Sequence, residues 1–132
     1  MARVRVLSTP KRLTGPITFW VHRPVDNEVW AKATRFDPPL PEAGPDGYPH
    51  YVVEHLGHEV WFASLDEVLH AEEVLSREPL PSGSELAREA GCPERDYMHW
   101  IETFPARLKA DDERHALVKM LRELREKIES EA

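Results

Sequence analysis

The stretch Phe62-Ala63-Ser64-Leu65-Asp66-Glu67 decides how the rest of the sequence is interpreted, because the chain changes character within it. A serine followed three residues later by a glutamate, directly before an apolar periodic segment, indicates a helix N-terminus with a capping box. The apolar residues that then recur at helical spacing are Leu65, Val68, Leu69, Ala71 and Leu75. We therefore predict a helix over residues 64–77, which ends before Pro79 and Pro81.

Upstream of this point the sequence predicts strands. Residues 4–7 and 17–22 are rich in β-branched and aromatic side chains and are bounded by prolines. Residues 28–36 alternate as a third strand does, although their alanines also suit a helix. Residues 37–49 contain five prolines and two glycines, so we predict a long exposed loop there.

Residues 51–63 predict a β-hairpin whose turn contains His55-Leu56-Gly57-His58. A two-residue Leu-Gly loop sets His55 opposite His58 and Glu54 opposite Glu59. A type I turn with Gly57 as a bulge residue sets Glu54 opposite His58 instead. Because facing carboxylates repel each other, the sequence favours the second register.

Downstream, three further segments have helical character. Ser82 and Gly91 are placed as the N-cap and C′ residues of a short helix, residues 97–108 keep a helical stripe with a break at Pro105, and Asp111 is placed to cap the last helix. Strands therefore precede helices without β-α-β alternation. We predict an α+β fold with an antiparallel sheet of four to five strands, followed by three to four helices packed on one face.

Composition limits the class of protein. The chain has 132 residues, a net charge of −7 and a mean hydropathy of −0.54, so we expect one domain over residues 1–132, mainly strands in 1–63 and mainly helical in 64–132. The single cysteine excludes an internal disulfide, and the N-terminus lacks the apolar stretch of a secretory signal. We therefore expect a cytoplasmic protein that does not enter a membrane.

Two features of the composition bear on setting and contacts. Twelve prolines, one Asn and no Gln fit a heat-tolerant bacterial host, although a GC-rich genome produces the same bias. Residues 1–36 carry a net charge of +5 and the remainder −12, which indicates either two contact surfaces or basic strands neutralised by acidic helices.

A group of titratable residues at the predicted hairpin suggests a metal site. Imidazole and carboxylate groups are ligands of divalent transition metals, and the candidate ligands here are His55, His58 and Glu54. The two histidines share one face of the sheet only in the register with the two-residue loop. A divalent-metal-binding protein or enzyme centred on this hairpin is therefore one alternative function.

Aromatic and basic residues in the predicted N-terminal strands suggest a second alternative. Aromatic rings stack on bases while Lys and Arg contact phosphates, as in grooves that bind single-stranded nucleic acid. The candidate residues are Trp20, Arg23, Trp30, Lys32 and Arg35. The overall charge of −7 disfavours nucleic acid as a partner.

The sequence favours a third interpretation, a non-catalytic protein that binds another macromolecule, and we expect this macromolecule to be a protein. The titratable residues form no recognisable catalytic motif, so we predict no catalytic residue and no resident cofactor. Aromatic side chains dominate interface hot spots, and the candidate anchors are Trp30, Phe36, Tyr48 and Trp100. The apolar seam Leu117, Leu121, Leu124 and Ile128 packs on the sheet or forms a homodimer through the last helix.

Two stretches also resemble a group of small uncharacterised bacterial proteins. The first is F-A-S-L-D-E-V-L-H at residues 62–70, and the second is His99-Trp100 followed by Phe104-Pro105 and Lys109. The likeness spans residues 50–125 loosely. These residues have capping and packing roles, so the resemblance implies a shared fold, and no activity attached to the group comes with it.

Overall fold

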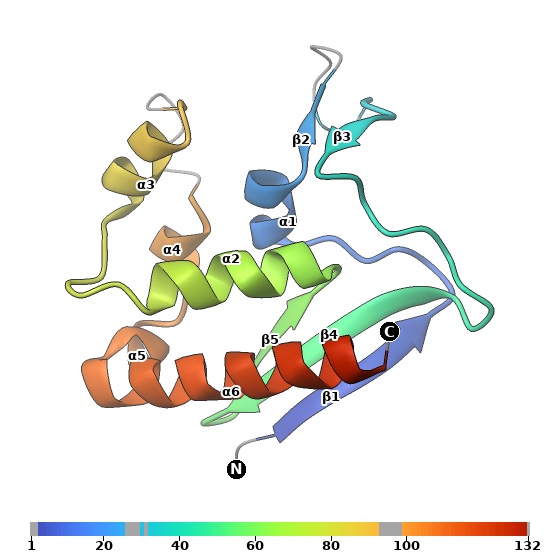
Figure 1. Cartoon of the computed structure of the whole chain (residues 1–132). Coiled ribbons are helices and arrows are strands. Elements are labelled where there is room, and N and C mark those ends of the chain that lie inside the picture. Colours follow the sequence, from blue (N-terminus) through green and yellow to red (C-terminus); the bar gives the residue numbers. More distant parts are fainter. Residues whose placement is uncertain (1–2, 26–29, 31, 93–98, 132) are drawn as a thin grey trace.

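A three-stranded antiparallel sheet in the N-terminal half and a set of helices after it form the α+β fold seen in the computed structural model (Figure 1). The structure describes residues 3–25, 30, 32–92 and 99–131. The elements in chain order are β1 (Arg3–Thr9), α1 (Pro16–Val21), β2 (Arg23–Pro24), β3 (Phe36–Asp37), β4 (Tyr48–His55), β5 (His58–Phe62), α2 (Leu65–Leu75), α3 (Gly83–Glu89), α4 (Trp100–Thr103), α5 (Ala106–Lys109) and α6 (Asp111–Ser130).

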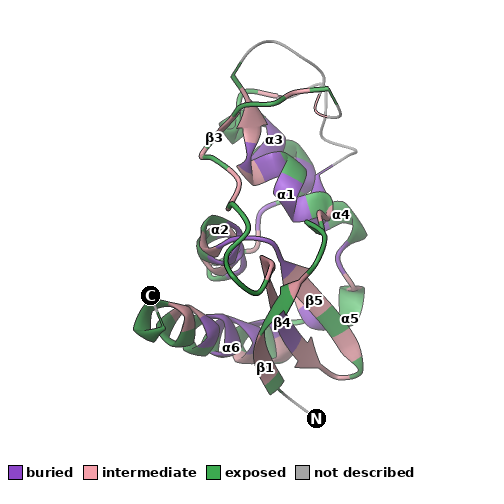
Figure 2. Cartoon of the chain, turned by 90° about the vertical axis from the view of Figure 1, so that its right-hand side faces the viewer, coloured by how far each residue is buried: buried purple, intermediate pink, exposed green. Residues whose placement is uncertain are grey.

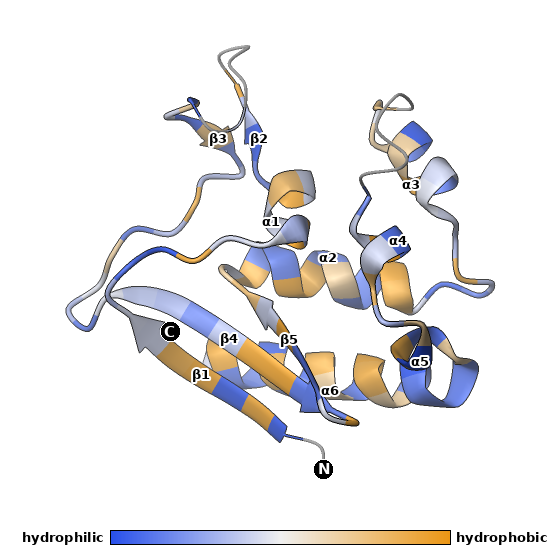
Figure 3. Cartoon of the chain, turned by 180° about the vertical axis from the view of Figure 1, so that it is seen from behind, coloured by the Kyte–Doolittle hydropathy of each residue, from blue (hydrophilic) through white to orange (hydrophobic). Residues whose placement is uncertain are grey.

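The sheet has the strand order β1-β4-β5, and β2 and β3 pair as a separate two-stranded ribbon. The predicted fold class is therefore confirmed, although its strands are divided between two sheets. Helices α2 and α6 lie against one face of the larger sheet, and Figure 3 shows its strands in front of α6 when the molecule is seen from behind. The core lies between these layers (Figure 2) and includes Val53, Phe62, Val68, Leu121 and Leu124.

The hairpin β4–β5 is confirmed, but the predicted register is wrong. His55 faces His58 and Glu54 faces Glu59, with Leu56 and Gly57 as a two-residue loop. Both loop residues have positive φ, 53° at Leu56 and 80° at Gly57, which matches the twist of a type I′ turn.

The facing carboxylates that disfavoured this register have arginine partners on β1. Arg3 lies 3.8 Å from Glu54, and the Arg5 guanidinium donates to Glu59 at 2.6 Å. The repulsion between Glu54 and Glu59 is offset by these ion pairs, and β1 is 45 residues or more away in sequence. The sequence of the hairpin alone therefore does not predict these ion pairs.

Helix α2 begins where the sequence predicts. The Ser64 hydroxyl accepts a hydrogen bond from the Glu67 N–H at 3.2 Å and so caps the helix. The Glu67 carboxylate accepts from the Ala63 N–H at 3.2 Å, one residue before the N-cap. In a standard capping box this carboxylate accepts from the N–H of the N-cap residue, Ser64, so here the second bond is shifted by one residue to Ala63.

Residues 17–21 belong to helix α1 and His22 is its C-cap, so the strand predicted over residues 17–22 is wrong. Pro16 occupies the first turn of α1, where its missing N–H costs nothing, and the Thr18 hydroxyl accepts from the Gly15 N–H at 3.0 Å. Ile17 and Trp20 then point into the core while Phe19 stays exposed. Burial of this one-sided stripe outweighs the β-propensity of the residues.

The segment between α1 and β4 contains less strand than predicted. Of the candidate strand 28–36, residues 28, 29 and 31 lie outside the described residues, and among the others only Phe36 belongs to a strand. The loop 37–49 is confirmed over most of its length. Pro49 lies in β4 opposite Ser8, beyond the point where β5 ends opposite Tyr51, so it occupies an edge position.

The helices after α2 follow the predicted boundaries closely. Ser82 caps α3, Gly91 follows with φ of 80°, and Pro105 separates α4 from α5. Asp111 is the first residue of α6, and Ala110 is its N-cap, so the predicted capping role of Asp111 is wrong. Among the described residues, none of the helices combines the length and the apolar character that a membrane crossing requires.

Candidate functional site

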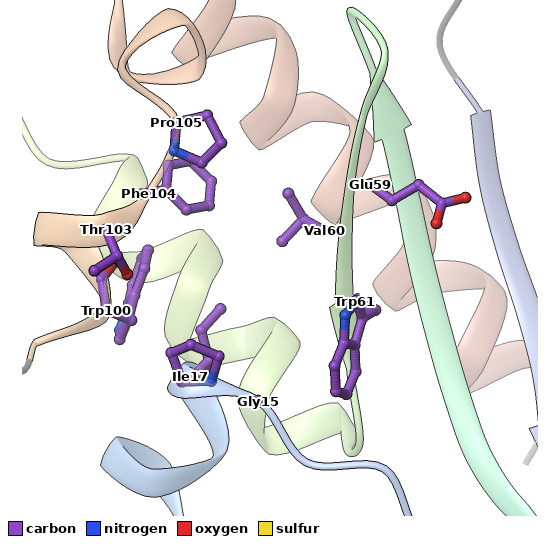
Figure 4. Close-up of a pocket in the computed structure, with 10 residues that line it drawn as sticks. Gly15, Ile17, Glu59, Val60, Trp61, Trp100, Thr103, Phe104 and Pro105 are labelled. Carbon is purple, nitrogen blue, oxygen red and sulfur yellow. The ribbon is translucent and has the colours of Figure 1, made fainter.

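A cleft opens between the edge strand β5 and the segment that joins α4 to α5 (Figure 4). Its volume is about 180 Å³. The residues that line it come from four parts of the chain, namely the start of α1, β5, α4 and the break at Pro105: Gly15, Pro16, Ile17, Glu59, Val60, Trp61, Trp100, Thr103, Phe104 and Pro105.

The local sequence explains why each wall is where it is. Gly15 precedes α1 and lies against β5, where a side-chain carbon would be in ordinary contact with the Trp61 ring at 3.4 Å. The His99 imidazole caps α4 by accepting from the Ile101 N–H at 3.1 Å. Pro105 ends the α4 turn, and Figure 4 shows the Phe104 ring pointing across the cleft towards Val60, with Thr103 beside Trp100.

Trp100 forms the deep wall and is fixed by hydrogen bonding and ring packing. It is 2% exposed, and its indole N–H donates to Nε2 of His70 at 3.0 Å. Burial lowers the pKa of His70 from 6.5. Burial, with a smaller contribution from His70, lowers the pKa of His99 to about 4. Both rings are therefore neutral at pH 7, and the wall holds no imidazolium charge.

The exposed edge of β5 forms the opposite wall. In a hairpin with a two-residue loop the closing pair is hydrogen-bonded, so His58, Val60 and Phe62 direct their backbone N–H and C=O groups towards β4. The corresponding groups of Glu59 and Trp61 point away from β4. Within the described part of the chain, these groups have no hydrogen-bond partner across the edge.

The chemistry of the lining suits binding of apolar groups. Glu59 supplies the only charge among the lining residues, and its carboxylate is already paired with Arg5. The Thr103 hydroxyl donates to the Trp100 carbonyl at 3.2 Å. The remaining surface is formed mainly by aliphatic and aromatic side chains and prolines, which gain free energy when an apolar group displaces water.

A second cluster of polar side chains lies inside the protein, where α1 meets the N-terminus of α2. The Glu67 carboxylate accepts from the Thr18 hydroxyl at 2.9 Å and from the Ser64 hydroxyl at 3.0 Å. His22 Nε2 lies 2.7 Å from the Ser64 oxygen and 3.3 Å from Glu67. All four side chains are at most 2% exposed, so this cluster is closed to a substrate and holds the fold together.

The electrostatics of this cluster favour a charged His22. Burial alone lowers its pKa, but the hydrogen bond to Glu67, the Pro38 carbonyl at 2.7 Å from Nδ1, and the charges of Glu67 and Asp66 outweigh burial. The net result is a pKa raised above 6.5. Protonated His22 then donates from both ring nitrogens, and Ser64 remains free to donate to Glu67.

The structure brings together only part of the predicted metal site. His55 and His58 face each other across the hairpin, but Glu54 alternates to the opposite face of the sheet. His55 Nε2 lies 2.8 Å from the Glu113 carboxylate on α6. In the part of the chain that the structure describes, no group of three His, Cys, Asp or Glu side chains is placed to hold a metal ion.

The structure brings only some of the predicted nucleic-acid residues together, with the Arg23 guanidinium 5.7 Å from the Trp20 ring centroid. Trp20 is 6% exposed and packs on His99, with ring centroids 4.6 Å apart. Arg23 donates to the Ala90 carbonyl at 3.0 Å, and the Trp30 indole N–H donates to the His22 carbonyl at 2.8 Å. Lys32 and Arg35 are exposed. The predicted common face depended on a strand at residues 17–22, but residues 17–21 belong to helix α1.

The four aromatic residues predicted to anchor a partner do not form one surface. Trp100 is a buried wall of the cleft, whereas Trp30 and Phe36 are half-buried and pack together with ring centroids 4.8 Å apart. Tyr48 is half-buried beneath Arg12, whose guanidinium lies 4.9 Å from its ring centroid. Exposed Phe19 contacts Trp30, also at 4.8 Å, and extends this aromatic cluster.

Most residues of the cleft were missed from the sequence. Ile17, Val60 and Trp61 carried only a strand signal, and Phe104-Pro105 carried only a helix break. Their convergence requires the chain path after α3, which no local pattern specifies. Comparisons with protein-family models, with curated proteins and with solved structures find no match for this chain.

Proposed function

We propose that the protein acts by binding another protein, and that the cleft between β5 and the α4–α5 segment receives an apolar side chain of that partner. The observation that carries this proposal is the largely apolar lining of an opening of about 180 Å³. An apolar cavity of about 150 Å³ is large enough for a benzene ring, so one aliphatic or aromatic side chain fits this volume.

A polypeptide suits the cleft better than the other macromolecules do. The lining has no basic residue to meet a phosphate, and the chain carries a net charge of −7. The cleft also lies beside the edge strand β5, whose outward backbone groups suit a polypeptide. The single cysteine, which cannot form an internal disulfide, supports a cytoplasmic setting for this interaction.

The test uses a library of random twelve-residue peptides displayed on phage and selected on the full-length protein. The central variant is Thr103→Trp, because Thr103 is exposed at the rim and a tryptophan there fills the cleft. The matched control is Arg107→Trp, which places the same ring on the neighbouring α5 outside the lining. We expect selected peptides to lose at least tenfold in affinity on Thr103→Trp and to keep their affinity on Arg107→Trp.

Two outcomes would contradict the proposed function. Peptides that bind wild type and Thr103→Trp equally place the binding surface elsewhere and contradict the proposal. If no peptide is selected while benzene or indole shifts the NMR signals of Val60 and Phe104, the cleft takes a small molecule, and the proposal is wrong in the class of its ligand.

A further inference from the structure

We infer that the partner binds as an extended segment that pairs with β5 as an additional strand, while one of its side chains enters the cleft. This inference rests on the proposed function and names the backbone geometry of its partner. Strand addition at a sheet edge is a general mode of peptide recognition, in which main-chain hydrogen bonds supply affinity and pockets for alternate side chains supply specificity.

The first argument comes from the backbone of β5. Glu59 and Trp61 present two N–H and two C=O groups away from β4, and in the described part of the chain nothing bonds to them across the edge. The alternating partial charges of these groups complement those of an extended strand. A helical partner has satisfied its own backbone groups and leaves those of β5 unpaired.

The second argument comes from the position of the cleft relative to the strand. Val60 faces the core side of the sheet, as do its neighbours Val53 and Phe62 in the register. A strand beside β5 alternates its side chains between the two faces, so every second residue points over Val60 towards Trp100 and Phe104. The cleft is where such a side chain arrives (Figure 4).

Two other occupants fit less well. A second copy of this chain carries the same net charge of −7, so the two copies repel each other as they approach. A chain-terminal carboxylate meets no basic side chain among the lining residues, and the charged residue in that lining, Glu59, has the same sign. The occupant is therefore an internal extended segment with an apolar residue, placed on the core side.

The experiment begins with the peptides selected on the wild-type protein that lose affinity on Thr103→Trp. Each backbone nitrogen of one synthetic peptide is methylated in turn, and affinity is measured by fluorescence anisotropy. A strand partner loses at least tenfold in affinity at every second position, because only alternate N–H groups face β5. Uniform tolerance, or losses without a period of two, overturns the inference.

A variant of the protein tests the same contact from the other side. Glu59→Pro removes an N–H that the β4–β5 ladder does not use, as proline at an edge position allows. Glu59→Ala is the matched control, because it loses the same ion pair with Arg5 and keeps the N–H. We expect Glu59→Pro to reduce peptide affinity at least tenfold relative to Glu59→Ala, and equal affinities overturn the inference.

The outcomes distinguish a failure of the added-strand inference from a failure of the proposed function. Cleft-dependent peptides without alternating N-methyl sensitivity leave the proposed function standing and reject the added strand. The absence of any Thr103→Trp-sensitive peptide rejects the proposed function itself. If Glu59→Pro does not fold, the N-methyl series on wild-type protein still decides the question.

Discussion

Glu67 shows how one side chain takes part in three levels of structure. Its backbone N–H is capped by Ser64, its carboxylate accepts from Ala63, Ser64 and Thr18, and its charge faces His22. The capping motif predicts the first role only. Thr18 and His22 lie more than 40 residues away, and α1 places them beside the N-terminus of α2.

The paired His22 predicts a defined dependence of stability on pH. Its folded pKa is raised above 6.5, so its contribution is complete below pH 6.5 and is lost as pH rises through the folded value. His99 behaves oppositely, because its pKa is lowered to about 4 and its contribution is lost as pH falls from 6.5 towards 4. Considering these two groups, thermal unfolding followed by circular dichroism should give the highest melting temperature near pH 6.5.

The variant Glu67→Gln tests whether the His22–Glu67 pair causes the loss of stability above pH 6.5. Removing one partner of a buried charge pair costs about 3–5 kcal/mol, so we expect a large loss of stability at pH 6.5 and a flatter decrease above it. His115→Gln serves as control, because His115 lies exposed on α6 and pairs with Glu78, which is also exposed. If His22 in the wild-type protein titrates below 6.5 by NMR, the assignment of a charged His22 is wrong.

At the scale of elements, the hairpin and α1 show where local rules compete with partners elsewhere. The electrostatic argument against facing glutamates was valid for an isolated hairpin, but Arg3 and Arg5 on β1 reverse it. The β-branched and aromatic residues of α1 suit a strand, but Pro16 starts a helix and burial of Ile17 and Trp20 stabilises it. Both errors arise because the deciding contact is distant in sequence.

The β4–β5 turn predicts the cost of a side chain at Gly57. Its φ is 80° and nothing lies within 4 Å of a side-chain carbon placed there, so the cost of Gly57→Ala is conformational. We expect a loss of about 1–2 kcal/mol in the free energy of unfolding, measured by urea denaturation. Gly44→Ala is the control, because its nearest contact is an ordinary 3.8 Å, and an equal loss there would contradict the explanation.

At the scale of the whole molecule, α6 determines how the two halves of the chain combine. Its seam residues Leu117, Leu121 and Leu124 are at most 1% exposed and pack against α2 and the sheet within one chain. The basic strand β1 and the acidic helices are thereby brought into one body. Arg125 and Arg122 add ion pairs from α6 to Glu72 on α2.

Because Leu117, Leu121 and Leu124 are buried within one chain, these three seam residues are not free to join two copies. We expect light scattering at high protein concentration to give the mass of a single chain, 15.2 kDa. A concentration-dependent mass that persists in Thr103→Trp and Glu59→Pro would show self-association through another surface. Loss of such association in either variant would place a second copy at the cleft.

The same packing predicts a large effect for Leu121→Ala. Leu121 is 1% exposed, and truncation of a buried leucine costs about 2–5 kcal/mol. Leu69→Ala is the matched control on α2, because Leu69 is 44% exposed and its truncation leaves no cavity. Chemical denaturation of both variants checks the difference, and a loss below 1 kcal/mol for Leu121→Ala would contradict the assignment of α6 to the core.

The sequence by itself determined the fold class, the hairpin, the starts of α2 and α3 and the break at Pro105. These features depend on caps, turn residues and periodicity, which act over a few neighbouring residues. Only the tertiary structure decided the hairpin register, the helical state of residues 17–21, the burial of Trp100 and the assembly of the cleft. Those outcomes depend on arginines, apolar surfaces and chain crossings that lie tens of residues away, where local pattern carries no signal.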